Sequence, residues 1–395
     1  MTDSKKIRLA VIGVGTMGSS HVRDIYSLPD TELVAVCDIL KERADQYAAQ
    51  FNATAYYNYI DLLNQAVLDG VVIATPHYDH TPISIDCLHK GIHVLTEKPL
   101  AVHVNDGRKM ISAYEKGRAA HPGLVFAIMF QQRTLGFWRK VKAMIDGGEL
   151  GRLVRSSWII TDWYRTQSYY DNGGWRATWK GEGGGVLLNQ CPHNLDLYQW
   201  FFGMPRRIAG FAAIGKYHRI EVEDEVTAYF EHENGMVGHF ITTTAESPGT
   251  NRLEIIGEKG KLVFEDGRLS FWRNAQSMFE FIQTSPNPFD RVDCQDEQVD
   301  FELTDQPGHT MVIEAFANAI LHGTPPIVQA VEGIHSLALG NGIMLSAFTG
   351  RPVEVPFDSD DYEQRLQALI RQSSFQKEVR EQEITDLSKS VGCYS

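Results

Sequence analysis

The sequence predicts a two-domain protein of class α/β plus α+β, with a doubly wound parallel sheet first and an open-faced, mainly antiparallel sheet with helices second. At 395 residues the chain is longer than one hydrophobic core usually serves. Up to about residue 130, short β-branched runs alternate with amphipathic stretches, the pattern of βαβ units. Beyond it, longer alternating runs are joined by glycine turns. We therefore expect domains at 1–130 and 131–356, then a C-terminal helix and tail at 357–395.

Five buried strands are expected in the first domain. A helix is predicted from His80 to Lys90, because Pro82 stands near its start and Gly91 follows its end. Strands that alternate with helices in this way form a parallel sheet. The five predicted strands are residues 7–13, 32–38, 70–75, 92–97 and 124–130.

The second domain is expected to begin with a helix from Leu135 to Ile145, closed by Gly147 and Gly148. Two alternating runs then flank Asn234-Gly235, which predicts a hairpin with a type I′ turn. Residues after about 373 are polar and weakly periodic, so we expect an arm or a disordered tail. Further turns are predicted at 258–260 and 266–267, and closing helices at 310–321 and 330–348.

The composition argues against several classes of function. The net charge of −13, from 50 acidic and 37 basic side chains, opposes contact with nucleic acid or anionic lipid. No apolar stretch approaches the roughly 20 residues that span a bilayer, and the first residues do not resemble a signal peptide. The five cysteines are scattered, odd in number and without CxxC spacing. We therefore expect a cytoplasmic protein without nucleic acid or membrane partners and without a structural metal.

A glycine motif follows the first predicted strand and opens a helical stretch. In Gly13-Val14-Gly15-Thr16-Met17-Gly18, the first glycine permits a tight turn, the second lets the backbone approach a pyrophosphate, and the third permits close helix packing. Phosphates would then lie at the helix N-terminus, where free N–H groups favour anions. The pattern predicts a dinucleotide site, although a glycine turn without a ligand is the alternative.

Asp38 ends the second predicted strand, 20 residues after Gly18. A carboxylate there accepts hydrogen bonds from both ribose hydroxyls and repels a 2′-phosphate, so NAD is favoured over NADP. Lys41 and Arg43 lie close by in the sequence and leave some NADP tolerance open.

At this point the chain resembles the Gfo/Idh/MocA oxidoreductases over residues of about 5 to 355. The resemblance depends on the glycine motif, on residues 73–100 with their Glu97-Lys98-Pro99 signature, and on residues 175–196, WRATWKGEGGGVLLNQCPHNLD. It implies a Rossmann domain for NAD, with Glu97 and Lys98 near the nicotinamide ribose and His193 as the catalytic histidine. It also implies cofactor or active-site contacts directly after the predicted strand 70–75, by Thr75, Pro76, His77 and His80.

The positions of Lys98 and His193 suit the oxidation of an alcohol. Lys98 follows the predicted strand 92–97. It is therefore expected at the carboxyl edge of the sheet, where doubly wound folds bind ligands. Its ammonium can hydrogen-bond a substrate oxygen and stabilise a developing alkoxide, whereas most lysines are only solvated. The imidazole of His193 titrates near neutrality, as a base for a hydroxyl proton requires.

Asn189 departs from the family pattern, because the position four residues before the histidine is commonly acidic. An amide cannot act as a base, so Asn189 is expected to orient substrate or His193 by hydrogen bonds. Pro192 between them means that the two residues need not share a helix face. Asp196 is expected either to orient the His193 ring or to lie on a helix surface.

Aromatic residues crowd the glycine-rich stretch before His193. Flat aromatic faces beside hydrogen-bonding groups suit the apolar face and hydroxyl rim of a pyranose. We predict substrate contacts for Trp163, Tyr164 and Trp175 and place Arg176 near the cofactor or substrate. Half or more of the group could instead be packed in a core: Trp163, Tyr164, Tyr169, Tyr170, Trp175 and Trp179.

These residues predict NAD-dependent oxidation of a secondary ring hydroxyl of a sugar, glycoside or cyclic polyol, with the hydride passing to nicotinamide C4. The NQCPHNLD variant with its aromatic approach is most similar to family members acting on glucosides or anhydrosugars, for example at C3. Two alternatives stay open: redox-neutral glycoside cleavage or epimerisation through a transient keto-sugar, and a non-catalytic NAD- or sugar-binding regulator. An exposed sheet face would favour a homo-oligomer.

Overall fold

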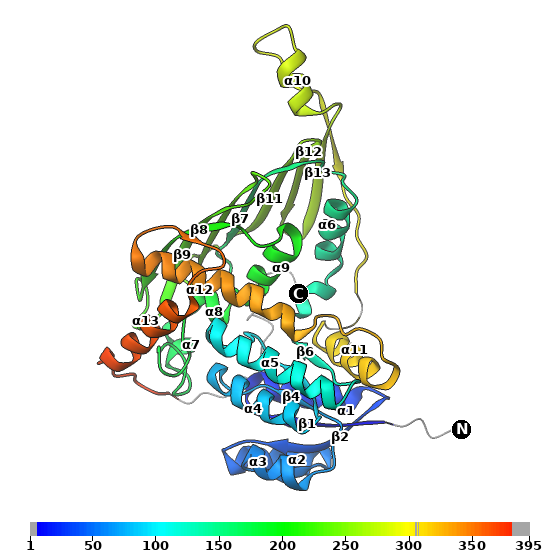
Figure 1. Cartoon of the computed structure of the whole chain (residues 1–395), viewed down its shortest axis with the longest axis vertical. Helices are drawn as coiled ribbons and strands as arrows, with labels where there is room; N and C mark the ends of the chain where they lie inside the picture. The colour runs from blue at the N-terminus through cyan, green and yellow to red at the C-terminus, as the bar shows by residue number, and fades with distance from the viewer. Residues whose placement is uncertain (1–5, 305, 307, 381–395) are drawn as a thin grey trace.

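The computed structural model describes residues 6–304, 306 and 308–380. Its first sheet is parallel and six-stranded, in the order β3-β2-β1-β4-β5-β6 (Figure 1). All five predicted strands are present, and the short β3 was not predicted. The strand order reverses beside β1, which places a ligand crevice at the carboxyl ends of β1 and β4. The strands are β1 Ile7–Ile12, β2 Thr31–Cys37, β3 Thr54–Tyr56, β4 Gly70–Ile73, β5 His93–Thr96 and β6 Phe126–Ile128.

Helices cover both faces of this sheet, which explains its apolar strands. Leu9 and Val11 of β1 enter one core cluster with α1 and α2, while Ala10 and Ile12 enter another with α4 and α5. Helix α4 begins at His77, three residues before the predicted start, so Pro82 lies inside the helix rather than in its first turn. The helices are α1 Thr16–Ser27, α2 Lys41–Phe51, α3 Tyr59–Gln65, α4 His77–His89 and α5 Val104–Ala120.

The second sheet has nine strands, in the order β14-β13-β12-β11-β7-β10-β9-β8-β15. Its pairs are antiparallel except β7 with β10, so the prediction of a mainly antiparallel sheet is confirmed. The strands are β7 Leu153–Ile160, β8 Arg207–Ile214, β9 Glu223–Glu231, β10 Val237–Thr243, β11 Asn251–Gly257, β12 Gly260–Glu265, β13 Arg268–Asn274, β14 Cys294–Gln298 and β15 Val353–Glu354.

One face of this sheet is covered by helices, and the other is left bare by the described part of the chain. Trp138 of α6, Leu195 of α9 and Ile343 of α12 join the core on the covered face. On the opposite face Phe211 of β8 is 74% exposed. The 3-10 segments and helices after β6 are η1 Gln131–Thr134, α6 Gly136–Asp146, α7 Gln167–Asp171, α8 Val186–Asn189, α9 Pro192–Phe202, α10 Met278–Thr284, α11 Gly308–His322, η2 Ala330–Glu332, α12 Gly333–Thr349 and α13 Ser359–Gln372.

Two later segments contact earlier parts of the fold. Helix α11 packs on α1 and β1, and the Thr310 hydroxyl donates to Asp24 at 2.8 Å. After α13 the chain lies against the region of α7, where Arg380 N donates to the Asp171 carbonyl at 2.9 Å. The remainder of the predicted tail, 381–395, lies outside the described residues.

The hairpin between β9 and β10 differs from the predicted type I′ turn. A type I′ turn needs positive φ at both central residues, but only Gly235, at φ +84°, adopts it. The amide of His232 donates to the Met236 carbonyl, so the loop has three residues and ends on a left-handed glycine. The Asn234 side chain accepts from Met236 N at 3.0 Å, which favours this turn.

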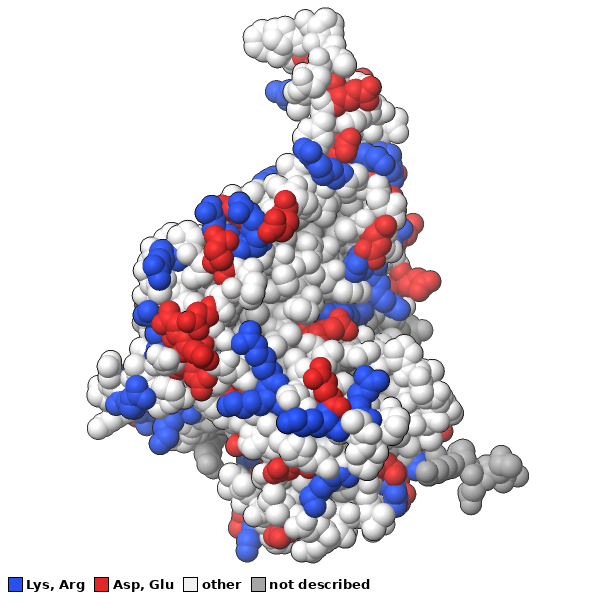
Figure 2. All heavy atoms as spheres, in the orientation of Figure 1, with Lys and Arg blue, Asp and Glu red and all other residues white. Residues whose placement is uncertain are grey.

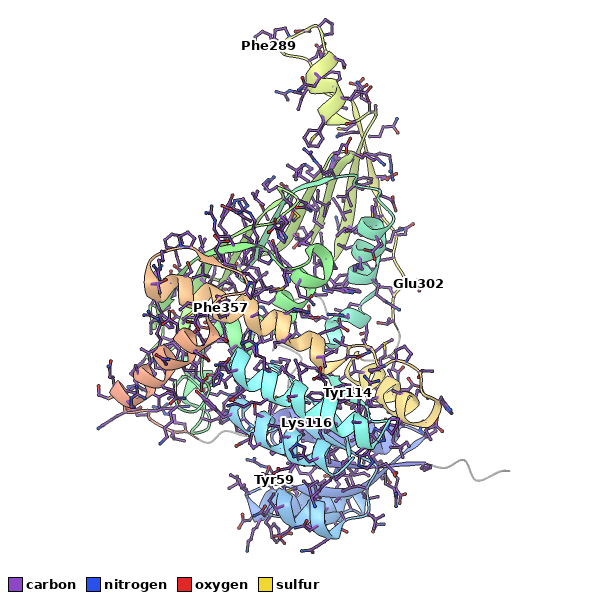
Figure 3. All side chains as sticks on the ribbon, viewed as in Figure 1. Tyr59, Tyr114, Lys116, Phe289, Glu302 and Phe357 are labelled. Carbon is purple, nitrogen blue, oxygen red and sulfur yellow. The ribbon has the colours of Figure 1, made fainter. Side chains whose placement is uncertain are left out.

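An arm formed by the chain between β13 and β14, with α10, projects from the end of the second sheet (Figure 1). Phe289 lies at its tip and is 88% exposed (Figure 3). Acidic and basic side chains are interspersed over the face shown in Figure 2. Within the described ranges, every helix is too short or too polar to cross a bilayer.

Candidate active site

The glycine motif forms the turn from β1 into α1. Gly13 has φ +85°, and a Cβ there would lie 2.8 Å from the Ala74 carbonyl oxygen. A Cβ on Gly18 would lie 1.8 Å from the Gly13 carbonyl oxygen, so both positions require glycine. A Cβ on Gly15 would meet nothing closer than the Arg43 side chain at 3.9 Å. Gly15 therefore leaves the space above the α1 N-terminus open for a pyrophosphate.

Asp38 is buried directly beside this turn. Its Oδ2 accepts from Val14 N at 3.0 Å and its Oδ1 from Leu40 N at 2.9 Å, which fixes the carboxylate at the end of β2. Arg43 Nη1 lies 3.4 Å from Oδ2 and brings a positive charge to the same place. Each carboxylate oxygen still has acceptor capacity for a ribose hydroxyl.

The segment after β4 contains one polar atom without a hydrogen-bond partner in the described chain and two histidines that contact carbonyl oxygens. Thr75 Oγ1 is buried without a hydrogen-bond partner among the described residues, as expected of a group that meets a cofactor. His77 Nδ1 lies 3.0 Å from the Glu182 carbonyl oxygen. His80 Nδ1 lies 2.8 Å from the Pro99 carbonyl oxygen and its Nε2 lies 3.0 Å from the Thr75 carbonyl oxygen, and an uncharged ring donates to one of the two. Pro76 precedes α4 directly, and its position alone does not mark it as a ligand.

Glu97 and Lys98 face different neighbours. The Glu97 carboxylate is buried against His21 Nε2 at 2.8 Å and also accepts from Lys98 N at 3.1 Å. Burial opposes both charges, but the carboxylates of Asp24 and Glu97 together raise the pKa of His21 to about 9, and the hydrogen bond and charge of His21 lower the pKa of Glu97 to about 2. Glu97 thus anchors the loop to α1, whereas Lys98 Nζ donates to the Asn189 carbonyl at 2.7 Å.

His193 lies in the first turn of α9 as a buried, uncharged base. Burial lowers the pKa of its imidazole well below the usual value, and the charge of Lys98 lowers it further. Its Nε2 lies 3.4 Å from the Gln131 amide nitrogen, and Phe130 packs edge-on against the ring. Its Nδ1 is buried without a partner in the described chain. The prediction that His193 titrates near neutrality is therefore wrong: its imidazole is uncharged at pH 7 and available to accept a proton, but as a weaker base than an exposed histidine.

Asn189 and His193 lie on different helices, because α8 ends at Asn189 and α9 begins at Pro192, so they do not share a helix face. The Asn189 amide nitrogen donates to Glu182, and its Oδ1 accepts from Tyr169 Oη at 3.1 Å. Asp196 differs from both expectations. It is buried rather than on a helix surface, and it binds Arg133 rather than the His193 ring, through two bonds of 2.6 and 2.8 Å.

The aromatic stretch divides into packed and accessible residues. Trp163 is 7% exposed, with its indole N–H on Asn194 Oδ1 at 3.3 Å, whereas Tyr164 is 51% exposed. Trp175 packs edge-on against His77, with ring centroids 5.2 Å apart, and Arg176 lies over it at 4.4 Å. Tyr170 and Trp179 are core residues.

Sequence reasoning missed Glu182, Gln190, Gln131 and His309. Glu182 is 1% exposed and bonded to Asn189. An acid between glycines in GEGGG is the one local signal for it, although the partners of its side chain, Ala177 and Asn189, lie only five and seven residues away. His309 of α11 lies near His21, with ring centroids 5.8 Å apart, and burial lowers the pKa of its imidazole to about 4.

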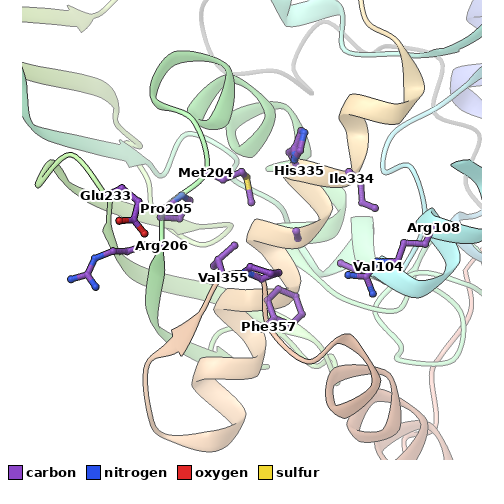
Figure 4. Close-up of a pocket in the computed structure, with 12 residues that line it drawn as sticks. Val104, Arg108, Met204, Pro205, Arg206, Glu233, Ile334, His335, Val355 and Phe357 are labelled. Atoms are coloured by element: carbon purple, nitrogen blue, oxygen red, sulfur yellow. The ribbon is translucent and has the colours of Figure 1, made fainter.

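The groove in Figure 4 is separate from this site. It has a volume of about 370 Å³ and lies between α5, α12 and the segment that follows β15. Its lining includes Val104, Ile334 and Phe357, and it shares no residue with the cluster around Lys98 and His193. Among the residues that the structure describes, no group of three or more His, Cys, Asp or Glu is placed to hold a metal ion.

The doubly wound sheet, its open glycine turn and the Lys98–His193 cluster at its carboxyl edge define an NAD-dependent oxidoreductase. Residues 7–121 match the oxidoreductase family described as "NAD-binding Rossmann fold", and residues 138–263 match the "GFO/IDH/MocA C-terminal domain". The chain belongs to the Gfo/Idh/MocA family, as the sequence motifs predicted.

Similar proteins include enzymes and solved complexes. The chain is 24% identical to scyllo-inositol 2-dehydrogenase (NAD(+)) of Bacillus subtilis, over 89% of this chain and 96% of that protein. It is 35% identical to inositol 2-dehydrogenase of Mycolicibacterium gilvum, over 51% of this chain and 53% of that protein.

Among solved structures, the WlbA dehydrogenase of Bordetella pertussis in complex with NADH and UDP-GlcNAcA has a TM-score of 0.75 and 27% identity, covering 90% of this chain and 100% of that one. Levoglucosan dehydrogenase with NADH has a TM-score of 0.74 and 20% identity, over 90% and 100% of the chains, and shows the shared fold.

Proposed function

We propose that the protein oxidises a secondary ring hydroxyl of a sugar, glycoside or cyclic polyol and passes the hydride to NAD. The observation that carries this proposal is the pairing of a buried, uncharged imidazole, His193, with the cation Lys98 at the carboxyl edge of the first sheet. Oxidation of an alcohol needs a proton acceptor and a partner for the developing oxyanion. The relatives named for scyllo-inositol and levoglucosan support a cyclic polyhydroxy substrate.

The cofactor would be held by Gly13, Gly15 and Gly18, with Thr16 and Met17 starting the helix behind the phosphates. Asp38 would receive the adenosine ribose, and Thr75 Oγ1 would face the cofactor after β4. When bound, NAD supplies the hydride acceptor. The open space at Gly15 and the unpartnered Thr75 hydroxyl fit such a ligand.

His193 would take the hydroxyl proton on Nδ1, its nitrogen without a partner in the described protein. For Nδ1 to accept, the proton must lie on Nε2, which requires the Gln131 amide to turn so that its oxygen, rather than its nitrogen, faces Nε2. Lys98 has three N–H groups and uses one on the Asn189 carbonyl, so two remain for the substrate oxygen. Burial lowers the pKa of Lys98 and the Glu97 charge raises it.

Trp175, Trp163 and Tyr164 would pack against the apolar face of the sugar ring, with Arg176 at its hydroxyl rim. The Arg176 guanidinium stacks on Trp175 and donates to Tyr169 Oη at 3.1 Å, and these two contacts fix its position. We extend the proposal to the C3 hydroxyl of a glucoside or anhydrosugar as the first position to test.

The test is a panel of sugars, inositols, glucosides and anhydrosugars assayed with NAD for absorbance at 340 nm, together with product analysis. NADH formation with one of them supports the proposal. A converted sugar without net NADH would replace it with redox-neutral cleavage or epimerisation. No conversion of any cyclic polyol would contradict it.

We also propose a homo-oligomer and a reducing compartment. The second sheet carries Phe211, which is 74% exposed, on the face that no helix of the described chain covers. Cys37, Cys87, Cys191 and Cys294 are unpaired thiols, which supports the cytoplasm.

A further inference from the structure

Glu182 is a buried carboxylate that the proposed reaction does not use. It stands in the loop before α8 and is 1% exposed. The backbone after it is tightly packed: Gly183 has φ +84°, and a Cβ there would lie 2.3 Å from Val102. A Cβ on Gly185 would lie 2.0 Å from the Glu223 carbonyl oxygen. This segment therefore has little freedom to move, and the Glu182 side chain is held in place.

Three segments of the site meet at Glu182. Its Oε1 accepts from the Asn189 amide nitrogen, and its Oε2 accepts from Ala177 N at 2.6 Å, beside Trp175 and Arg176. Its carbonyl oxygen faces His77 Nδ1 at 3.0 Å. Glu182 thus joins α8, the aromatic loop and the start of α4.

The charge of Glu182 dictates the polarity of the hydrogen bonds beyond it. An ionised carboxylate only accepts, so Asn189 must turn its NH₂ group toward Glu182 and its Oδ1 away. That Oδ1 accepts from Tyr169 Oη at 3.1 Å and from Gln190 Nε2 at 3.2 Å. Gln190 Nε2 also donates to Tyr169 Oη at 3.2 Å, so both of its N–H groups are used.

The last group in this network is the side-chain oxygen of Gln190, an acceptor without a donor in the described chain. With its NH₂ committed to Asn189 and Tyr169, Gln190 has only Oε1 left, which is buried without a partner among the described residues. A buried amide oxygen of this kind needs a donor. A ring hydroxyl of the substrate would supply one.

We propose that Glu182 is a positioning residue for this site: its carboxylate orients the Asn189 amide and, through it, presents Gln190 Oε1 as an acceptor for a ring hydroxyl that is not oxidised. The proposal rests on the proposed function, since it takes a polyhydroxy ring as the ligand. The role of Glu182 goes beyond the proposed function, because it assigns substrate recognition to a residue that touches neither cofactor nor substrate.

The test compares Glu182→Gln with Asn189→Asp and with the swapped variant Glu182→Gln/Asn189→Asp. Glu182→Gln places two amides together, and Asn189→Asp places two carboxylates together. Each single change therefore removes the fixed donor-to-acceptor direction of the hydrogen bonds. The swap restores a donor facing an acceptor with the direction reversed, so the carboxylate introduced at position 189 still accepts from Tyr169 and Gln190. Burial raises the pKa of Glu182, while Arg176 lowers it, so assays are run at pH 8 to favour the carboxylate.

Each variant is measured for kcat and KM with the best sugar of the panel, NADH affinity by fluorescence, and melting temperature. Glu182→Gln and Asn189→Asp should each lower kcat/KM about 10- to 100-fold, mainly through KM, with NADH affinity within about twofold. The swap should recover at least about tenfold over either single variant.

Glu223→Gln is the matched control. Glu223 is a buried glutamate that accepts from Leu187 N at 3.1 Å at the start of the same helix, and no hydrogen bond joins it to Asn189 in the described chain. It should change the melting temperature while leaving kcat/KM within about threefold.

A wild-type rate in Glu182→Gln, additive losses in the swap, or loss of folding and NADH binding in Glu182→Gln would each overturn the proposal. If the wild type oxidises no sugar, the proposed function fails before any variant is compared. An active wild type without rescue by the swap contradicts only the role of Glu182.

Discussion

The contacts of Lys98 and His193 determine what substitution of each residue should do to catalysis. Lys98 donates to one carbonyl, and His193 has one nitrogen without a partner in the described chain. Neither side chain holds the glycine turn. We therefore expect Lys98→Met and His193→Ala to lower turnover by about 100-fold or more, because both act on charge that develops in the transition state.

The measurement is kcat and KM from pH 6 to 10 with the best sugar of the panel. Because burial lowers the pKa of His193 well below 6.5, wild-type activity should be flat above that value and fall only as pH drops through the lowered pKa. The residual rate of His193→Ala should instead rise with pH as hydroxide takes over the proton. NADH titration and melting curves control for folding, and a near wild-type rate in either variant would reject the assignment.

Asp38 should set the choice between the two dinucleotides. It is buried with its oxygens on Val14 N and Leu40 N, and its charge opposes a 2′-phosphate. Asp38→Ala should reduce the ratio of NADP to NAD dissociation constants by at least about tenfold, or about 1.4 kcal/mol. Arg43, beside the same carboxylate, would then be free to bind the phosphate. Calorimetric titration decides, and an unchanged ratio would remove Asp38 from this role.

At the scale of elements, the turn from β1 to α1 allows two glycines to be separated by function. A Cβ on Gly18 meets the Gly13 carbonyl at 1.8 Å, whereas a Cβ on Gly15 meets only the Arg43 side chain at 3.9 Å. Gly18→Ala should therefore lower both the melting temperature and NAD affinity. Gly15→Ala should keep the wild-type melting temperature within a few degrees while weakening NAD about tenfold or more. Equal effects of the two substitutions on both readouts would contradict this division.

The link between α1 and the segment after β5 should depend on pH. The folded-state pKa of His21 is raised to about 9, so its stabilisation is complete below 6.5 and is lost as pH rises through 9. The pKa of Glu97 is lowered to about 2, so its stabilisation is present above 4.5 and is lost as pH falls toward 2. His21→Gln should cost about 3 to 5 kcal/mol in unfolding free energy between pH 5 and 6.5, since it leaves the buried Glu97 carboxylate without its positively charged partner.

Urea unfolding at several pH values measures this cost, which should shrink above pH 9. His232→Gln is the contrast. Burial lowers the pKa of His232 to about 4, so the stability conferred by its neutral form declines as pH falls below 6.5, the opposite direction. A cost of His21→Gln that does not vary with pH would contradict the ion pair.

At the scale of the whole molecule, the uncovered face of the second sheet predicts self-association. Phe211→Glu replaces an exposed apolar side chain on this face with a charged one. It should therefore shift the molar mass in solution toward that of a single chain. Light scattering after size-exclusion chromatography tests this. A substitution on the arm, Phe289→Glu, is the control, because Phe289 is also highly exposed but lies at the tip of the arm, away from that face (Figure 3). A wild type that is already a single chain would refute the oligomer.

The sequence by itself determined the features that depend on local pattern. Strands buried on both faces appear as continuous apolar runs, and the glycine motif, Asp38 and the Glu97-Lys98-Pro99 signature occupy fixed distances from them. These were enough for the fold class, the family and the cofactor. The three-residue strand β3 escaped because so short a run carries no period.

Only the tertiary structure decided which side chains meet. Glu97 binds His21, Asp196 binds Arg133, and Glu182 binds Asn189. Apart from the last, these partners lie more than 60 residues apart, and a carboxylate between glycines looks the same in sequence whether it is solvated or buried. The hairpin turn was decided the same way, because Asn-Gly satisfies more than one turn and the register of β9 on β10 selects among them. Hydrogen-bond partners follow from packing in three dimensions, which no local pattern records.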